Sequence, residues 1–212
     1  MSYKLPRIYP ITDTHISGLT HAEQVERLIA GGARLIQLRD KTATPREFFA
    51  DADRALEIAR RHDVKIIIND RADIALALRA DGVHLGQEDL PPAEARRMLG
   101  VGAIIGYSTH SIEQVREAVS LPIDYLAIGP IFPTSSKLRA DPVIGLDSLR
   151  EIRLIIGDLP LVAIGGVNRA TLESVFDAGA DSVAIIGDIL SAPTEIEVRM
   201  RDLLSDSSAE SG

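Results

Sequence analysis

The feature that most constrains this chain is a regular alternation of short apolar runs with longer amphipathic segments. Eight runs are rich in Ile, Leu and Val, and each is followed by a segment with helical periodicity. Such an alternation predicts a parallel sheet that is buried on both faces, because parallel strands need crossover connections that cover them. The predicted strands are residues 7–12, 35–38, 64–68, 82–85, 103–107, 125–128, 161–164 and 182–186.

Eight strand–helix units are the number found in a closed (β/α)₈ barrel, also called a TIM barrel. We therefore expect an α/β fold with a single barrel domain over residues 1–204. An open doubly wound sheet is the alternative, but no Gly-x-Gly-x-x-Gly sequence opens the first unit. Residues 205–212 are small and polar, and they predict a disordered tail. The expected helices lie near residues 20–31, 45–62, 71–79, 92–99, 111–119, 146–156, 168–178 and 192–204.

Composition excludes several classes of function. A net charge of −8 over 212 residues argues against broad binding to nucleic acid or to an anionic membrane. The chain has no cysteine, which excludes disulfides, thiolate metal sites and cysteine nucleophiles and fits a reducing compartment. The N-terminal residues lack the apolar core of a signal peptide, and no run approaches 18 apolar residues. We expect a cytoplasmic protein that acts on small molecules, and the sequence does not define its oligomeric state.

Two aspartates follow neighbouring predicted strands. Asp70 comes directly after the strand that ends at residue 68, and Asp89 follows the strand that ends at residue 85. If these strands are parallel neighbours, both carboxylates lie at one rim of the sheet, where they suit Mg²⁺. The alternative is that Asp70 caps the next helix and that Asp89 lies in an ordinary turn.

A dense polar group follows the second strand. It runs from Gln37 through Leu38, Arg39 and Asp40 to Lys41. Side chains at alternate positions share a direction in an extended segment, so Gln37, Arg39 and Lys41 are expected to line one pocket. An arginine fork and a lysine point charge are suited to phosphate oxygens, although a solvated salt-bridge cluster is the alternative.

Further candidates follow the fifth and sixth strands. Ser108 and His110 stand after the fifth strand, and His110 is a possible acid or base near neutral pH. His84 lies within a strand, where packing in the barrel is the simpler role. The sixth strand is followed by a long connection, residues 129–145, which carries three hydroxyl groups and an ammonium group and is a possible lid. These four residues are Thr134, Ser135, Ser136 and Lys137.

The last two strands are followed by glycines. Gly165 and Gly166 follow the seventh strand, and Ile186 and Gly187 follow the eighth. In barrels this pair of loops often binds phosphate through backbone N–H groups and a helix N-terminus. The predicted rim therefore has two metal-type carboxylates, three cations and a separate neutral phosphate site, which suits two phosphorylated substrates or one substrate with two phosphate groups.

Taken together, the strand-end motifs closely resemble those of the thiamine phosphate synthase family. The resemblance extends from about residue 9 to residue 204. The motifs are Tyr-Pro-Ile-Thr-Asp at 9–13, Gln-Leu-Arg-Asp-Lys at 37–41, Asn-Asp-Arg at 69–71, Gly-Val-His-Leu-Gly-Gln-Glu-Asp-Leu-Pro at 82–91, Ser-Thr-His at 108–110, Gly-Pro-Ile-Phe-Pro-Thr-Ser-Ser-Lys at 129–137 and Ile-Gly-Gly at 164–166.

The resemblance implies a barrel transferase that joins 4-amino-5-hydroxymethyl-2-methylpyrimidine diphosphate to a thiazole phosphate. It implies Mg²⁺ bound by Asp70 and Asp89, and it gives Arg39, Lys41, Lys137 and Ser108 the catalytic contacts. The implied contacts to the pyrimidine diphosphate are residues 37–41, Asn69, Ser108 and Lys137. Those to the thiazole phosphate are Thr134, Ser135, Ser136, Gly165, Gly166, Ile186 and Gly187.

The chain departs from the family pattern at two positions. Gly187 stands where the family usually has serine, and Ser136 replaces the more usual threonine. The first change implies weaker binding of the thiazole phosphate, whereas the second keeps the hydroxyl. A thiazole tautomerase and a silent thiazole or thiamine phosphate binding protein are the alternatives. A tautomerase generally lacks the full acidic and basic set present here, and a silent binding protein has no need of it.

Overall fold

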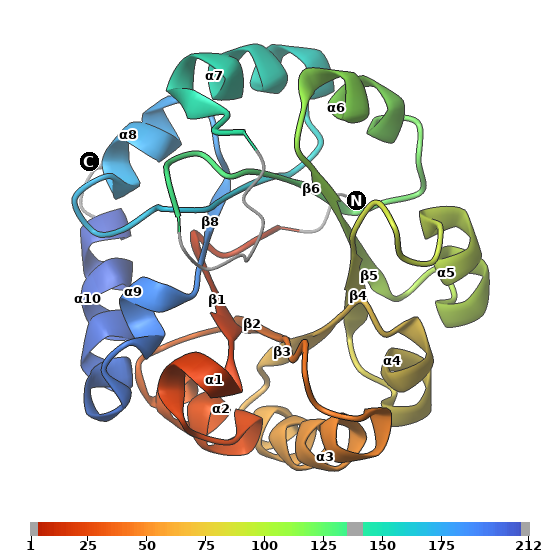
Figure 1. The fold of residues 1–212 in the computed structure, drawn as a ribbon, viewed down its shortest axis with the longest axis vertical. Coiled ribbons are helices and arrows are strands. Elements are labelled where there is room, and N and C mark those ends of the chain that lie inside the picture. The colour runs from red at the N-terminus through yellow and green to blue at the C-terminus, as the bar shows by residue number, and fades with distance from the viewer. Residues whose placement is uncertain (1–3, 135–141, 209–212) are drawn as a thin grey trace.

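The eight strands form one closed parallel barrel. The structure is a computed structural model, and it describes residues 4–134 and 142–208. Each strand pairs with the next along the chain, and the last pairs with the first. Viewed down the barrel, the helices form an outer ring around the strands (Figure 1). Closure confirms the predicted (β/α)₈ barrel and excludes the open doubly wound sheet.

The strands lie close to the predicted positions. β3 and β5 each extend further at the C-terminal end, so Asn69, Ser108 and Thr109 are strand residues. Ser108 was expected in a loop, but it pairs in register with Ala127 of the next strand. The strands are β1 (Ile8–Thr12), β2 (Leu35–Leu38), β3 (Lys65–Asn69), β4 (Gly82–Leu85), β5 (Ile104–Thr109), β6 (Tyr125–Ile128), β7 (Leu161–Ile164) and β8 (Ser182–Ile185).

Every predicted helix is present in the described parts of the chain. The helix α3 begins with a common start signal, since Thr44 and Glu47 form a reciprocal capping box and Pro45 opens the first turn. The helices of the ring are α2 (His21–Ala30), α3 (Pro45–Arg61), α4 (Ala72–Leu78), α5 (Pro92–Leu99), α6 (Ile112–Ala118), α7 (Gly145–Ile156), α8 (Leu172–Asp177) and α10 (Ile196–Ser208). Among the described residues, no helix is long and apolar enough to cross a bilayer.

Two short helical segments were not predicted, and a third, a 3₁₀ turn, replaces the start of the helix expected at residues 192–204. They are α1 (Thr14–Ser17), α9 (Gly187–Leu190) and the 3₁₀ turn η1 (Pro193–Glu195). Segments of three or four residues are too short to show helical periodicity. α1 and α9 directly follow β1 and β8, so they shape the rim of the barrel.

The last helix runs past the expected domain boundary at residue 204. α10 continues to Ser208, and Ser207 is buried. Asp202 and Asp206, one turn apart, both pair with Arg169, which ties the end of the helix to the rest of the barrel. The remainder of the predicted tail, residues 209–212, lies outside the described residues.

The apolar side chains form two layers. One layer fills the space between the strands and the surrounding helices, and it includes Ile36, Ile66 and Ile68. The other fills the inside of the barrel and includes Ile67 together with Tyr9 and Tyr125. Because successive strand residues point to opposite faces, both layers draw on the same apolar runs. The inner layer forms the floor on which the site is built.

Candidate active site

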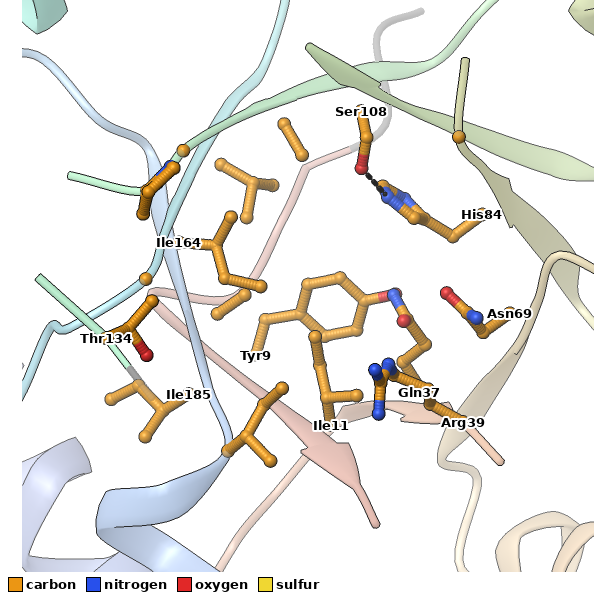
Figure 2. Close-up of a pocket in the computed structure, with 18 of the residues that line it drawn as sticks. Tyr9, Ile11, Gln37, Arg39, Asn69, His84, Ser108, Thr134, Ile164 and Ile185 are labelled. Atoms are coloured by element: carbon orange, nitrogen blue, oxygen red, sulfur yellow. Dashed lines mark hydrogen bonds between the residues drawn. The ribbon is translucent and has the colours of Figure 1, made fainter. Parts of the chain in front are cut away.

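A large pocket opens at the C-terminal ends of the strands. Its volume is about 880 Å³, and its lining includes residues from the ends of all eight strands or the loops that follow them. Figure 2 shows several of these side chains converging on the centre of the barrel, with the Tyr9 ring at its middle. This is the face at which barrel enzymes hold their active sites. Most of the predicted site residues in the described chain lie around this one cavity.

The two predicted metal ligands face each other across the rim. Asp70 and Asp89 both line the pocket, and they are close enough for the Asp70 carboxylate to raise the pKa of Asp89. α4 begins at Ala72 without any side-chain cap, so the helix-cap interpretation of Asp70 is wrong. Asp89 does close a turn, because its Oδ2 accepts a hydrogen bond from the Gly86 N–H at 2.6 Å. The carboxylate that closes the turn is therefore also a carboxylate of the pocket.

The electrostatics of this pair favour a cation. Burial raises the pKa of Asp89 above its ordinary range, and the adjacent Asp70 carboxylate raises it further. Lys41 supplies one positive charge, since its ammonium group pairs with Asp70. The described residues contain no cluster of three or more His, Cys, Asp or Glu side chains that would enclose a metal. A cation here would complete its shell with water or ligand oxygens, as Mg²⁺ commonly does.

The arginine of the basic group is held by a residue of the neighbouring strand end. Arg39 Nη1 donates to Asp13 Oδ2 at 2.7 Å, and both side chains are mostly buried. Asp13 Oδ1 meanwhile accepts from the N–H groups of His15 and Ile16 at the start of α1. One carboxylate thus caps a helix and orients the guanidinium toward the pocket.

Leu38 and Asp40 do not share the direction of Gln37, Arg39 and Lys41. Leu38 is fully buried in the layer between strands and helices. Burial opposes the ionisation of Asp40, but hydrogen bonds from the N–H groups of Ala43 and Thr42 and from the Thr14 hydroxyl lower its pKa to about 2. Asp40 therefore stays ionised, and its hydrogen bonds to Thr42 and Ala43 hold the conformation of the loop that carries Lys41.

The floor of the pocket is polar. Gln37 and Asn69 line it with side chains that are almost fully buried, and His84 lies between β3 and β5. The His84 Nε2 is 2.8 Å from Ser108 Oγ, the contact marked in Figure 2. Burial lowers the pKa of His84 to about 4, so its imidazole is neutral at physiological pH. The packing role expected for His84 is thus joined by a direct contact to a predicted site residue.

His110 also lines the pocket, and one of its nitrogens is engaged by the backbone. Its Nδ1 is 2.7 Å from the carbonyl oxygen of Gly129. A carbonyl only accepts, so Nδ1 carries the proton. The contact ties the end of β5 to the start of the connection after β6.

The glycines after β7 and β8 border the opposite side of the cavity. A Cβ on Gly165 would lie 2.5 Å from Pro130 Cβ, and one on Gly166 would lie 2.6 Å from the Pro133 carbonyl oxygen. Both glycines also have positive φ, so close packing and backbone conformation each require them. Gly187 is the first residue of α9, whose N-cap is Ile186. A Cβ built on Gly187 would have no neighbouring atom within 4 Å. Thr134 lines the same side, whereas Ser135, Ser136 and Lys137 lie outside the described residues.

Sequence reasoning did not assign a role to several residues of the site. Asp13 and Tyr9 were named only within the Tyr-Pro-Ile-Thr-Asp motif at residues 9–13, and Tyr125 only as part of an apolar run. Tyr9 and Tyr125 place their hydroxyls 3.0 Å apart inside the barrel. Strand alternation was the available signal, because it places Tyr9 on the same face of β1 as Ile11.

Comparisons with known proteins agree with one another. A family model described as "Thiamine monophosphate synthase" matches residues 8–189. A thiamine-phosphate synthase from Koribacter versatilis is 47% identical over 199 residues, which cover 91% of this chain and 92% of the relative. One from Chloroflexus aurantiacus is 43% identical over 187 residues, covering 88% and 86%.

Two solved structures are similar to this chain, one in sequence and fold and the other in fold alone. A thiamine phosphate pyrophosphorylase from Pyrococcus furiosus superposes with a TM-score of 0.87 at 34% identity, covering 97% of both chains. A 3-hexulose-6-phosphate synthase superposes with a TM-score of 0.70 at 17% identity, covering 95% of this chain and 99% of its own. The second similarity shows the barrel fold alone.

Proposed function

This chain belongs to the thiamine monophosphate synthase family, and from that premise we propose the substrates and the residue roles of its reaction. It is a transferase of the thiamine-phosphate synthase type. The proposed substrates are 4-amino-5-hydroxymethyl-2-methylpyrimidine diphosphate and a thiazole phosphate. The C–O bond to the diphosphate breaks with its electron pair on oxygen, and the thiazole nitrogen forms the new C–N bond. The products are thiamine phosphate and diphosphate.

One observation carries the proposal. A single cavity joins a rim of two carboxylates and two cations to a separate, uncharged glycine border. The charged rim is suited to a diphosphate, and the glycine border is suited to a phosphate monoester held by backbone N–H groups. A pocket of about 880 Å³ is within the range of small-molecule sites.

At the charged rim, we assign the departing diphosphate to Arg39 and Lys41. Asp13 orients the Arg39 guanidinium, so the fork is in place before the substrate arrives. Lys41 is half-exposed and can turn from Asp70 to a phosphate oxygen. Lys137 belongs to the same proposed set on the strength of the sequence. Fixed cations of this kind stabilise the charge that develops on the leaving group.

Asp70 and Asp89 are the proposed ligands of Mg²⁺. Their mutual repulsion and the raised pKa of Asp89 are the features that a divalent cation would relieve. When bound, the ion would supply Lewis-acid stabilisation of the diphosphate oxygens. The two carboxylates leave most coordination positions to water and substrate, which is how Mg²⁺ is usually held.

The remaining residues position the two rings. We assign the aminopyrimidine to Gln37, Asn69 and Ser108 on the pocket floor. The thiazole phosphate is assigned to the glycine border and the start of the β6 connection, through Thr134, Ser135, Ser136, Gly165, Gly166, Ile186 and Gly187. Holding both reactants in line can lower the activation free energy by roughly 7–11 kcal/mol. No protein nucleophile is required.

The proposal also covers partners and location. A net charge of −8 suits a protein that recognises its phosphorylated ligands through local donors and not through a general attraction to polyanions. The absence of cysteine suits the cytoplasm. An isomerase that moves a proton on the thiazole would be independent of the diphosphate rim, so it is not favoured.

The test is a coupling assay with purified protein and both substrates, in the presence of Mg²⁺ or EDTA. Thiamine phosphate is measured as thiochrome fluorescence after oxidation. The proposal predicts Mg²⁺-dependent product in the wild type and its loss in Asp70→Ala. Product that forms as fast in EDTA as in Mg²⁺, and as fast in Asp70→Ala as in the wild type, would refute the metal assignment. Tautomer exchange without coupling would support the isomerase.

A further inference from the structure

The pocket floor contains a continuous chain of hydrogen-bonded side chains that crosses the barrel. Gln37 Nε2 is 3.1 Å from the Tyr9 hydroxyl, which is 3.0 Å from the Tyr125 hydroxyl. The Tyr125 hydroxyl is 2.9 Å from His84 Nδ1. His84 Nε2 is 2.8 Å from Ser108 Oγ. The chain therefore links a residue of β2 to a residue of β5 through three intervening side chains.

The three intervening side chains are rigidly packed. Tyr9 is 1% exposed and Tyr125 is fully buried. The His84 ring stacks on Tyr125 with centroids 5.5 Å apart, and Tyr9 meets Tyr125 edge to face. Gly106 makes room for this contact, because a Cβ there would lie 2.0 Å from Tyr125 Cζ and 2.5 Å from His84 Nδ1. These three side chains thus have a fixed geometry, and only the protons between them can be rearranged.

The direction in which one hydrogen bond of the chain is donated fixes the direction of the next hydrogen bond. A neutral imidazole has one N–H donor and one acceptor nitrogen, so His84 can donate at one end only. Gln37 donates through Nε2 to Tyr9. If Tyr9 then donates to Tyr125 and Tyr125 to His84 Nδ1, the His84 proton lies on Nε2 and points to Ser108. Ser108 is left with its own hydroxyl proton to give to a ligand.

The two ends of the chain then have opposite character toward the pocket. Gln37 Oε1 accepts no hydrogen bond from the residues that the structure describes, so its lone pairs are available to a ligand. Ser108 Oγ accepts from His84 and offers a proton. The pocket floor therefore presents an acceptor on the β2 side and a donor on the β5 side. A heterocycle with an exocyclic amino group and an unprotonated ring nitrogen has the matching pattern.

We propose that Tyr9, Tyr125 and His84 are positioning residues that orient this hydrogen-bond chain and so select an amino-substituted ring over its oxo-substituted analogue. The proposal deepens the function assigned above and rests on it for the identity of the substrate. The oxo analogue has an acceptor in place of the amino group and an N–H in place of the ring nitrogen. It would require the Gln37 amide to turn over, so that Oε1 faces Tyr9, and the hydrogen bonds of the other links to reverse their direction.

The first test measures ring specificity. kcat/KM is determined for the 4-amino pyrimidine diphosphate and for its 4-oxo analogue, with the wild type, Tyr125→Phe and Tyr9→Phe. The control is Tyr107→Phe, a tyrosine of β5 that packs in the layer between strands and helices. Tyr125→Phe and Tyr9→Phe should each lower the preference for the amino ring about tenfold, the order expected for one buried hydrogen bond. A preference within twofold of the wild type in a folded Tyr125→Phe or Tyr9→Phe variant would overturn the proposal.

The second test reads the proton directly and does not depend on turnover. Nitrogen-15 NMR distinguishes the two neutral tautomers of histidine, and the His84 signals are assigned by their loss in His84→Gln. The proposal predicts the Nε2–H tautomer in the wild type without ligand. The Nδ1–H tautomer would overturn the proposed direction of the chain. If the coupling assay fails while the Nε2–H tautomer is found, the assigned substrate is wrong but the direction of the chain is supported.

Discussion

Replacing Asp13 with asparagine should separate the orientation of Arg39 from the local structure of the rim. Asp13 Oδ1 caps α1, and Oδ2 accepts from Arg39 Nη1 at 2.7 Å. Asparagine keeps an oxygen for the cap but presents an amide N–H₂ group to the guanidinium. The guanidinium would lose its partner in a place where the arginine side chain is 17% exposed.

The expected magnitude follows from burial. Breaking a fully buried ion pair from one side destabilises a protein by about 3–5 kcal/mol, and exposed pairs contribute roughly 0–1 kcal/mol. The Arg39–Asp13 pair lies between these limits, so the free energy of unfolding should fall by about 2 kcal/mol. In a domain of this size that is a decrease in Tm of roughly 4–8 °C. kcat/KM should fall about ten- to a hundredfold, because the diphosphate loses a pre-oriented fork.

Asp147→Asn provides a matched control. Asp147 also pairs with an arginine at 2.7 Å, but its side chain is fully exposed on α7. Its replacement should change the free energy of unfolding by less than about 0.5 kcal/mol and leave kcat/KM unchanged. Urea denaturation and the coupling assay are measured on both variants. If Asp13→Asn behaves like Asp147→Asn in both assays, the reasoning from the orientation of Arg39 is refuted.

Three further predictions follow from single residues. Gly187→Ser has free space for its side chain and would add a hydroxyl donor, so it should lower KM for the thiazole phosphate several-fold. An unchanged or higher KM in steady-state kinetics would contradict the assignment of α9 to this phosphate. Asp40 has a pKa of about 2, below its usual 3.8, so its charge stabilises the fold above pH 4, and this contribution is lost as the pH falls toward 2. Between pH 6 and pH 2.5, the free energy of unfolding measured in urea should therefore fall more in the wild type than in Asp40→Asn, by at most about 2 kcal/mol. An equal fall in both proteins would exclude this role. Gly106→Ala should destabilise the barrel by more than about 1 kcal/mol because its methyl group would overlap Tyr125, whereas Gly102→Ala, with open space around its Cβ, should be nearly neutral in thermal unfolding.

The barrel could be predicted because its signal is repeated in every unit. Runs such as residues 125–128 and 161–164 coincide with the observed strands, since a strand buried on both faces is usually apolar at each position. Short rim helices such as α9 escaped prediction because three or four residues carry no period. The end of α10 was missed because residues 205–208 have no apolar residue, and the pairing of Asp206 with Arg169 joins segments far apart in the sequence.

The site was predictable where chemistry and strand ends coincide. Asp70, Asp89, Arg39 and Lys41 follow strands, and the closed barrel brings them to one rim. Contacts between distant segments could not be predicted in the same way. Nothing in the sequence near Arg39 indicates that Asp13 holds it, because the pairing depends on the register of β1 and β2.

Polar groups inside the barrel were the hardest to predict. Tyr125 lies in an apolar run, and its hydroxyl acquires a role only when β1, β4 and β6 place Tyr9 and His84 beside it. The available hint was Gly106, a glycine within a strand, which often marks a close approach of neighbouring groups. Such networks require the three-dimensional arrangement, because each link joins residues far apart in the chain.

The most direct test of the account is the stoichiometry of the coupling reaction. Diphosphate and thiamine phosphate are measured in the same sample, with each substrate alone and with both together in Mg²⁺. The account predicts that the two products form in equal amounts and only when both substrates are present. Diphosphate release without thiamine phosphate, or no product from a folded protein with either thiazole tautomer, would contradict it.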